Sequence, residues 1–275
     1  MIEQEPEVRY HMLRPEQIVA RRKECPVVYI PIGNLEWHGA HNPVGADGLR
    51  AEGMAVRCAQ KGGGLAFPPL YYGDSRLEAL MEVNAHDKDL IAQGMDLPPE
   101  SFAADKSPFT ATEQAINYHK LLLHILAEAE SLGFQVGVLV IGHFPLIDHA
   151  RAAVLQFNQR RYSKAQGMLA WALMDAGLAD YPYSADHAGA WETSQLMALH
   201  PQTVDLDLLP PRGEPIVGTG WSIDPHDSTA EFGRETIEKA DDIAVREVRH
   251  RLKNRGLYNG HGRSLLEGLW KADRE

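Results

Sequence analysis

The sequence contains few cysteines, no excess of basic residues and no long apolar run. Cys25 and Cys58 are the only cysteines among its 275 residues, and neither lies in a CxxC or Cys/His ligand spacing. Such sparse usage is typical of the reducing cytoplasm, where we expect this chain and two ordinary buried or half-buried thiols. Residues 1–22 mix acids and bases without the apolar stretch of a secretory signal. Because nowhere do about 18 apolar residues follow one another, neither standard export nor a membrane span is predicted.

The charge balance is acidic. Lys and Arg number 27 against 38 Asp and Glu, which gives a formal net charge of −11, and the excess acid is spread along the chain. A nucleic-acid partner is not expected, because a phosphate-binding surface needs a basic patch and none is visible. With 44% hydrophobic and 24% charged residues the composition is that of a soluble globular protein. It excludes disordered, collagenous and coiled-coil chains, and the length allows one large domain or two small ones.

Strand patterns alternate with helix patterns along the chain. The β-branched runs at 25–32 (CPVVYIPI) and 135–141 (QVGVLVI) predict strands that are buried on both faces. A further strand is expected at 65–72, at a sheet edge because of Pro68 and Pro69. The expected α/β fold has a largely parallel sheet covered on both faces, in one domain. Helices are predicted at 47–62 with Asp47 as N-cap, at 112–132, 148–161 and 189–201, and after a capping box at 228–231.

The segment 85–112 differs from the rest of the chain. It lacks clear periodicity and collects Pro98, Pro99 and Pro108. Long connections of this kind are often lids, so the segment is either a lid insertion or a passive one.

Acidic and histidine side chains follow the first strand. In extended backbone, residues i and i+2 point the same way, so Glu36 and His38 can face one ion. The glycines of the NLEWHGAHNPVGAD stretch let the chain fold Asp47 back toward them. Carboxylate and imidazole together suit Zn²⁺ or Mn²⁺. The alternative is that Asp47 only caps a helix while Glu36 and His38 are solvated loop residues.

Two other segments carry similar side chains. His143 ends the clearest strand, and in DHAGAWETS His187 precedes a helix that has Glu192 in its first turn. Each has a structural explanation, because a lone histidine is often a hydrogen-bonded structural residue and the helix dipole favours an early glutamate. Open α/β sheets nevertheless bind ligands beyond the carboxyl ends of their strands, so the three segments are expected to form one site.

Taken together, these motifs resemble a known family. NLEWHGAHNPVGAD is similar to the signature of the creatininase (creatinine amidohydrolase) family, roughly Glu-x-His-Gly-x-His-x-Pro followed by an Asp. HAGAWETS, the strand that ends in Gly142-His143 and the segment DPHDSTAEFGRE are also similar, so the likeness runs from Val27 to about Ile243. It implies a single 1–275 domain, a three-layer α/β/α sandwich with a mostly parallel, mixed sheet. It also implies one or two divalent ions per chain, Zn²⁺ and/or Mn²⁺, and a homo-oligomer, a hexamer or trimer of dimers.

The resemblance also implies roles for individual residues. Glu36, His38, Asp47 and His143 match metal ligands, with Asp47 in the bridging position, and His187 matches a residue that moves protons. Where creatininase has a metal-binding glutamate two residues after the strand-end histidine, this chain has Pro145. Either Glu192 completes the second metal site, or the centre holds only one metal tightly.

The implied function is that of a metal-dependent hydrolase. It would open a small cyclic amide, or a cyclic ketone or sugar-like ring, with a metal-bound hydroxide. MEVNAHDKD and the Pro-rich segment replace a Gly-Thr segment found in many relatives, which points to a substrate other than creatinine. One alternative is C–C bond hydrolysis of an inositol-derived cyclic diketone (3-dehydro-inosose type), in carbohydrate metabolism. Another is a non-catalytic metal or small-ligand binding protein. His187 and Glu192 are the expected catalytic residues, and Tyr72, Tyr183, Trp191 and His41 the expected substrate-binding residues.

Overall fold

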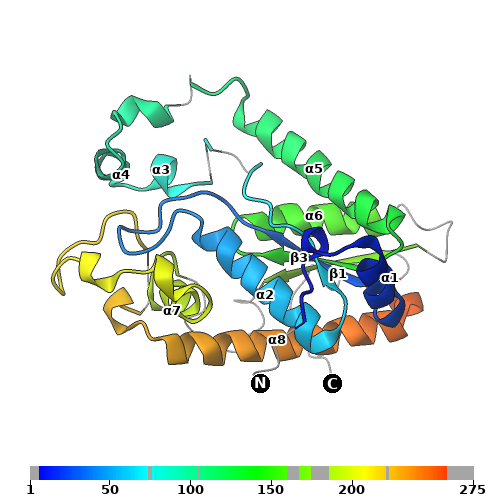
Figure 1. Ribbon diagram of the computed structural model, residues 1–275. Helices are drawn as coiled ribbons and strands as arrows, with labels where there is room; N and C mark the ends of the chain where they lie inside the picture. Colours follow the sequence, from blue (N-terminus) through cyan, green and yellow to red (C-terminus); the bar gives the residue numbers. More distant parts are fainter. Residues whose placement is uncertain are drawn as a thin grey trace.

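A parallel β-sheet lies at the centre of the molecule (Figure 1). The computed structural model describes residues 6–73, 76–77, 79–103, 106–159, 167–174, 186–220 and 223–258. Within these residues the strands follow the order β2-β1-β3-β4, and every ladder between them is parallel. The antiparallel component of the expected mixed sheet is therefore not found in the described strands. Their bounds are Val27–Ile32 for β1, Leu65–Ala66 for β2, Val136–Ile141 for β3 and Leu169–Met174 for β4.

The central strands are apolar on both faces because helices cover both sides of the sheet. All residues of β1 and β3 are buried. Side chains such as Val28 and Ile30 pack toward α5 and α6, whereas Val27 and Tyr29 pack toward α2 and α8. This is the predicted three-layer α/β/α arrangement. The helices are α1 (Pro15–Glu24), α2 (Ala46–Gly62), α3 (Met81–Asn84), α4 (Lys88–Gly94), α5 (Ala111–Ser131), α6 (Leu146–Gln159), α7 (Ala190–Leu199) and α8 (Ala230–Lys253).

Most predicted boundaries shift by one or two residues in the structure, and two helix caps and one strand differ in kind. Asp47 is not the N-cap of α2: the helix begins at Ala46 after Gly45, so the Asp47 carboxylate lies inside the first turn. The cap of α8 is Thr229, whose hydroxyl accepts the Phe232 N–H. The predicted capping box began one residue earlier, at Ser228. The strand expected at 65–72 forms a regular ladder only at Leu65–Ala66, because Pro68 and Pro69 interrupt it, and Leu70 then makes a single parallel bridge with Ile32.

The segment 85–112 contains short helical elements. It includes α4, a 3₁₀ turn at Pro99–Phe102 and the start of α5, and it extends beside α3 at the upper left of Figure 1. The Asp87 carboxylate accepts the Gly218 N–H at 2.9 Å, which ties the segment to a distant loop. Its action as a lid stays a prediction.

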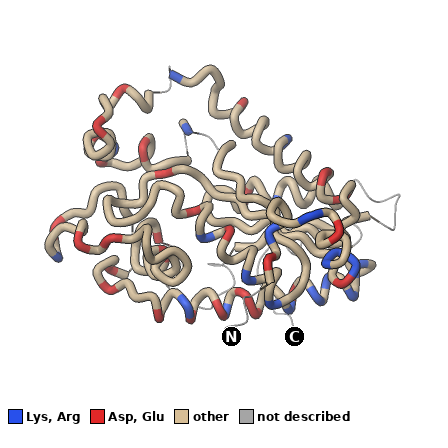
Figure 2. The backbone as a smooth tube through the Cα atoms, in the orientation of Figure 1, with Lys and Arg blue, Asp and Glu red and all other residues tan. Residues whose placement is uncertain are grey.

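Charged residues are distributed over the whole fold. Figure 2 shows Asp and Glu on many elements, with Lys and Arg between them. None of the helices in the described part of the chain combines the length and apolarity that crossing a membrane requires.

Candidate metal centre

Two glycines allow α2 to begin against the ends of β1 and β3. A Cβ atom on Gly33 would lie 2.3 Å from the Gly48 nitrogen, and one on Gly142 would lie 2.0 Å from the Asp47 carbonyl oxygen. Only glycine permits backbones to approach so closely. The first turn of α2 therefore places Asp47 between the loop that follows β1 and the residue that follows β3.

Asp47 contacts two histidines, one with each carboxylate oxygen. His38 Nε2 lies 3.1 Å from Asp47 Oδ1, and His143 Nδ1 lies 3.1 Å from Asp47 Oδ2. His143 Nδ1 is also 3.0 Å from Glu36 Oε2. These four side chains are all 5% exposed or less. They come from the post-β1 loop, α2 and the end of β3, as the rule for parallel sheets predicts.

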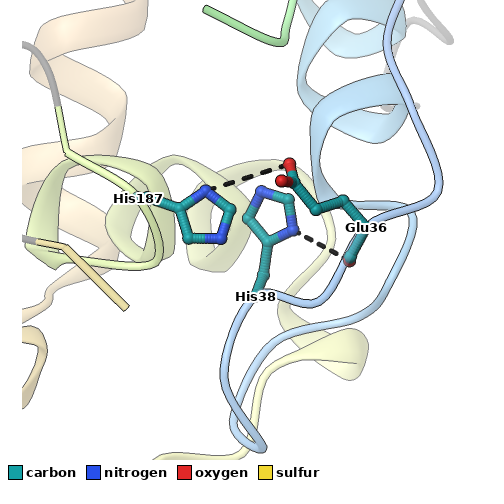
Figure 3. Close-up of side chains that lie close together, drawn as sticks. All are labelled: Glu36, His38 and His187. Atoms are coloured by element: carbon teal, nitrogen blue, oxygen red, sulfur yellow. Dashed lines mark hydrogen bonds and ion pairs between the residues drawn. The ribbon is translucent and has the colours of Figure 1, made fainter. Parts of the chain in front are cut away.

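Glu192 and His187 complete the cluster from the start of α7. Glu192 Oε2 lies 3.6 Å from His38 Nε2, and His187 Nδ1 lies 3.9 Å from Glu36 Oε2. Figure 3 shows the imidazoles of His38 and His187 side by side, with Glu36 next to both. The side chain of His187 is 20% exposed, more than the others. All six residues that the sequence nominated as metal ligands or proton carriers are thus brought together.

Each histidine is oriented by a backbone carbonyl. His38 Nδ1–H donates to Glu36 O at 3.0 Å, His143 Nε2–H to Ala79 O at 3.1 Å and His187 Nε2–H to Trp37 O at 2.7 Å. A carbonyl can only accept, so these hydrogen bonds fix the tautomer of each ring. The other nitrogen of each ring faces the carboxylates, to which it can donate a proton or beside which it can bind a metal ion. Metal-binding histidines characteristically have such partners.

The electrostatic environment favours a cation. Burial lowers the pKa of His38, but the charges of Asp47, Glu192 and Glu36 outweigh it and raise the pKa to about 10. The pKa of His143 is likewise well above its usual value, because Asp47 and Glu36 outweigh the effect of burial. Positive charge is thus strongly attracted to the space between these side chains, where a metal ion competes with the protons.

Unpartnered oxygens show that the residues present fit a divalent metal. Glu36 Oε2 and Asp47 Oδ2 are buried, and when His143 Nδ1 carries no proton they receive no hydrogen bond from the described residues. Buried carboxylate oxygens without donors are costly unless a cation satisfies them. Three sets of ligand atoms lie within 4.8 Å of one another: Glu36, Asp47 and His143; His38, Asp47 and Glu192; Glu36, His38 and His187. Mixed carboxylate and imidazole donors are suited to Zn²⁺ and Mn²⁺.

The residues nominated for substrate binding lie in different environments. His41 is buried with its Nε2 near Ala188 O and Thr193 Oγ1, and burial lowers its pKa to about 4. Trp191 is 1% exposed and packs edge-on against Phe232 of α8. Tyr72 is 69% exposed. Tyr183 lies outside the described residues. Their roles in binding substrate stay predictions.

Several residues that support the cluster were not predicted from the sequence. Met81 N–H donates to Glu36 Oε1 at 2.7 Å, and Arg50 Nη1 donates to Glu192 Oε1 at 2.6 Å. The Asp186 carboxylate accepts the backbone N–H of Trp191 and fixes the start of α7. Burial, with the nearby Glu192 charge, raises the pKa of Asp186 to about 7. Only the spacing of Arg50, three residues after Asp47 on a helix, is visible in the sequence.

Pro145 has no side-chain atom that could bind a metal. It is exposed and immediately precedes the first residue of α6. The carboxylate nearest to His38 Nε2 after Asp47 comes instead from Glu192.

The chain is similar to a known protein family and to two characterised hydrolases. The family model described as "Creatininase: Creatinine amidohydrolase" matches residues 11–248. The chain is 26% identical over 205 residues to a 3-dehydro-scyllo-inosose hydrolase of Thermotoga maritima, a match that covers 71% of this chain and 57% of that protein. It is 26% identical over 195 residues to a creatinine amidohydrolase of Pseudomonas putida, covering 66% and 67%. The match thus spans little more than half the length of the first relative.

Solved structures show the same fold. The structure called "Creatininase Mn" superposes with a TM-score of 0.67 at 21% identity, over 90% of this chain and 99% of that one. A Zn-Zn form of a mutant creatininase gives a TM-score of 0.66 at 21% identity, over 90% and 98%.

Proposed function

This chain belongs to the creatininase family, and on that premise we propose that it is a metal-dependent hydrolase that opens a small cyclic substrate. One observation carries the proposal. Asp47 belongs to two separate ligand sets, one with Glu36 and His143 and one with His38 and Glu192. A carboxylate that faces a histidine with each of its oxygens is suited to bridge two ions.

The chain's own residues would hold these ions and control the protons. Glu36, Asp47 and His143 would hold the first ion, and His38, Asp47 and Glu192 the second. The chemistry supplied by such ions when bound is Lewis acidity toward a carbonyl oxygen and a water of lowered pKa. Relatives of this fold that carry Mn or Zn in their names support either metal.

His187 is suited to accept a proton and return it. Its Nε2–H is fixed on Trp37 O, so only Nδ1 is available for exchange, and this atom faces Glu36. Burial and the neighbouring His38 lower the pKa of His187, which keeps the imidazole neutral at neutral pH. A neutral imidazole beside the reacting atoms can take a proton as base and deliver it to the leaving atom as acid.

The proposed substrate class is supported by the names of the relatives and by two positions at which this sequence differs from the creatininase pattern. One relative is named for a cyclic amide and the other for an inosose. We assign this chain a cyclic amide or a cyclic ketone or sugar-like ring, and not creatinine. The first departure is Pro145, which stands where creatininase has a metal-binding glutamate. The second is the segment around Met81, whose N–H donates to Glu36; it differs from the Gly-Thr segment of many relatives.

A product assay tests the function. Protein loaded with Zn²⁺ or Mn²⁺ is incubated with lactams, formamides, creatinine and inosose-type ketones, and the products are analysed. Release of ammonium or an amine identifies C–N cleavage, and a keto acid without nitrogen identifies C–C cleavage. Turnover of a ring other than creatinine that stops on chelation supports the proposal, and turnover of creatinine contradicts the assigned substrate. Metal binding without turnover of any ring favours the second candidate, a non-catalytic binding protein, which Pro145 motivates.

We propose the same family pattern for the assembly. The chain forms a homo-oligomer, a hexamer or trimer of dimers, as a single-domain cytoplasmic protein whose 85–112 segment acts as a lid. Light scattering after size-exclusion chromatography measures the mass in solution, and a monomer at 30.6 kDa contradicts the oligomer.

A further inference from the structure

A buried arginine lies directly behind the metal cluster. Arg50 is 6% exposed and is not a member of any ligand set. Its Nη1 donates to Glu192 Oε1 at 2.6 Å and to Gly142 O at 3.3 Å, and its Nε donates to Gln195 Oε1 at 2.9 Å. A buried guanidinium is costly unless its N–H groups are hydrogen-bonded. The three acceptors of Arg50 must therefore keep their positions in the folded protein.

Two helices meet at this arginine with matched spacing. Asp47 and Arg50 lie three residues apart on α2, and Glu192 and Gln195 lie three residues apart on α7. Residues at this spacing share one face of a helix. The α2 face therefore presents a carboxylate and a cation, and the α7 face presents a carboxylate and an amide that hold the cation.

The orientation of the amide is itself determined. Gln195 Nε2 donates to Thr236 Oγ1 of α8 at 3.4 Å, and the Thr236 hydroxyl donates to Gly233 O at 3.0 Å. The Gln195 oxygen therefore points toward Arg50. The result is a continuous hydrogen-bonded chain from α8 through Gln195 and Arg50 to Glu192.

The two oxygens of Glu192 consequently have different roles. Oε1 is held by Arg50, whereas Oε2 accepts the Ala188 N–H at 2.8 Å and lies 3.6 Å from His38 Nε2. The carboxylate cannot rotate without breaking an ion pair between two buried groups. Since Arg is always protonated, Arg50 can orient Glu192 but cannot itself bind a metal.

We propose that Arg50 is a positioning residue that leaves only one oxygen of Glu192, Oε2, free to serve as a ligand of the second metal. The inference rests on the proposed function, because it assumes that Glu192 is a metal ligand. The positive charge of Arg50 also offsets the negative charge of Glu192, which is the third buried carboxylate of the cluster after Glu36 and Asp47. The second metal site thus depends on a pair of residues on two helices, Arg50 on α2 and Glu192 on α7.

Metal stoichiometry and affinity test this assignment. Apo protein is titrated with Mn²⁺ by calorimetry, and the signal of the spin-coupled Mn²⁺ pair is followed by electron paramagnetic resonance. The wild type is expected to bind two ions and Glu192→Gln one. Arg50→Met should retain the first ion and weaken the second by about 10- to 100-fold, the range for residues that orient metal ligands. Arg50→Lys, which keeps the charge but not the fork, should weaken it less.

Arg57→Met is the matched control. Arg57 is on the same helix and donates to the buried Asp241 carboxylate at the same distance, 2.6 Å, but lies outside the cluster. It should lower stability and leave both ions with unchanged affinity. If Arg50→Met does not fold, Arg50→Lys is measured in its place. A merely structural role of Arg50 would leave the signal of the spin-coupled Mn²⁺ pair unchanged in Arg50→Lys, whereas a positioning role would weaken it.

The outcomes separate the two proposals. A folded Arg50→Met protein that binds both ions with wild-type affinity, while Glu192→Gln binds one, overturns the role of Arg50 alone. Two ions in Glu192→Gln overturn the ligand assignment and, with it, the role of Arg50. Wild-type protein that binds no Mn²⁺ or Zn²⁺ contradicts the proposed function itself.

Discussion

The imidazoles of the cluster owe their orientation to main-chain atoms. His38, His143 and His187 each donate one ring N–H to a backbone carbonyl, of Glu36, Ala79 and Trp37 respectively. Substituting a neighbouring side chain leaves these acceptors in place. Substitutions of the carboxylates should therefore report on metal binding and not on histidine tautomers.

At Asp47 the expected effect is large. Asp47→Ala removes the carboxylate that contacts both His38 and His143, so affinity for both ions should fall by at least about 100-fold, beyond the usual effect of a residue that only orients ligands. Turnover should be lost with them, while circular dichroism shows a folded protein. Elemental analysis after dialysis measures the loss. Retained metal and activity would exclude Asp47 as the bridge.

Asp241 gives a pH-dependent prediction away from the metal centre. Burial raises its pKa to about 6, although Arg57 acts in the opposite direction. The folded-state pKa exceeds the unfolded value, so the stabilisation from this group is present at low pH and is lost as pH rises through about 6. Between pH 5 and pH 7.5 the loss is about 1 kcal/mol of unfolding free energy.

Asp241→Asn isolates this effect from other titrating groups. The difference in unfolding free energy, wild type minus variant, should be more positive at pH 5 than at pH 7.5 when measured by urea titration. Histidines that titrate in this range contribute equally to both proteins and cancel. A difference that is constant with pH would contradict the raised pKa.

At the scale of elements, the position of α2 depends on a glycine. Gly142→Ala would place a Cβ 2.0 Å from the Asp47 carbonyl oxygen, which is backbone and cannot rotate away. The first turn of α2 must move from β3, at a cost of about 1–3 kcal/mol in stability. Mn²⁺ affinity should fall as well. Gly256→Ala is the control, because its Cβ would meet nothing within 4 Å. Equal metal affinity in the two variants would refute the argument.

The segment before α4 is tied to the metal ligands. Ala79 O accepts from His143, and Met81 N–H donates to Glu36. Chelation frees both ligands to move, so amide hydrogen exchange over 79–94 should accelerate, whereas the buried interior of α5 around Leu122 should not change. Exchange that is identical with and without metal would argue against coupling between this segment and the site.

For the whole molecule, metal binding should add stability. An ion that binds only the folded state at about 100 times its dissociation constant stabilises by about 2.7 kcal/mol. In a chain of this size that corresponds to a rise in Tm of roughly 5–10 °C. Calorimetry on chelated protein should show the rise on addition of Zn²⁺ or Mn²⁺ and little with Mg²⁺, which prefers oxygen ligands. No response to any of these ions would contradict a metal centre.

The net charge of the molecule also bears on the substrate. At −11 the protein repels anions at long range. Among the rings proposed as substrates, a neutral or cationic one would therefore approach more easily, and an anionic one would need local attraction from bound metals or an arginine.

Local patterns in the sequence determined much of this architecture. The runs at β1 and β3 are apolar throughout, and such runs predict strands covered on both faces. The i, i+2 spacing of Glu36 and His38 and the Gly-His end of β3 pointed to one edge of the sheet, where the structure places them. These features are local because strand burial and side-chain direction repeat every two residues.

The tertiary structure alone decided how the cluster is supported. Asp47 was expected both to cap its helix and to bind metal; the helix begins one residue earlier, at Ala46, and the carboxylate faces the histidines. Arg50 and Glu192 lie 142 residues apart in the sequence, and His143 finds its acceptor 64 residues away. Such contacts leave no periodic trace, because they depend on the angle and distance at which packed helices meet.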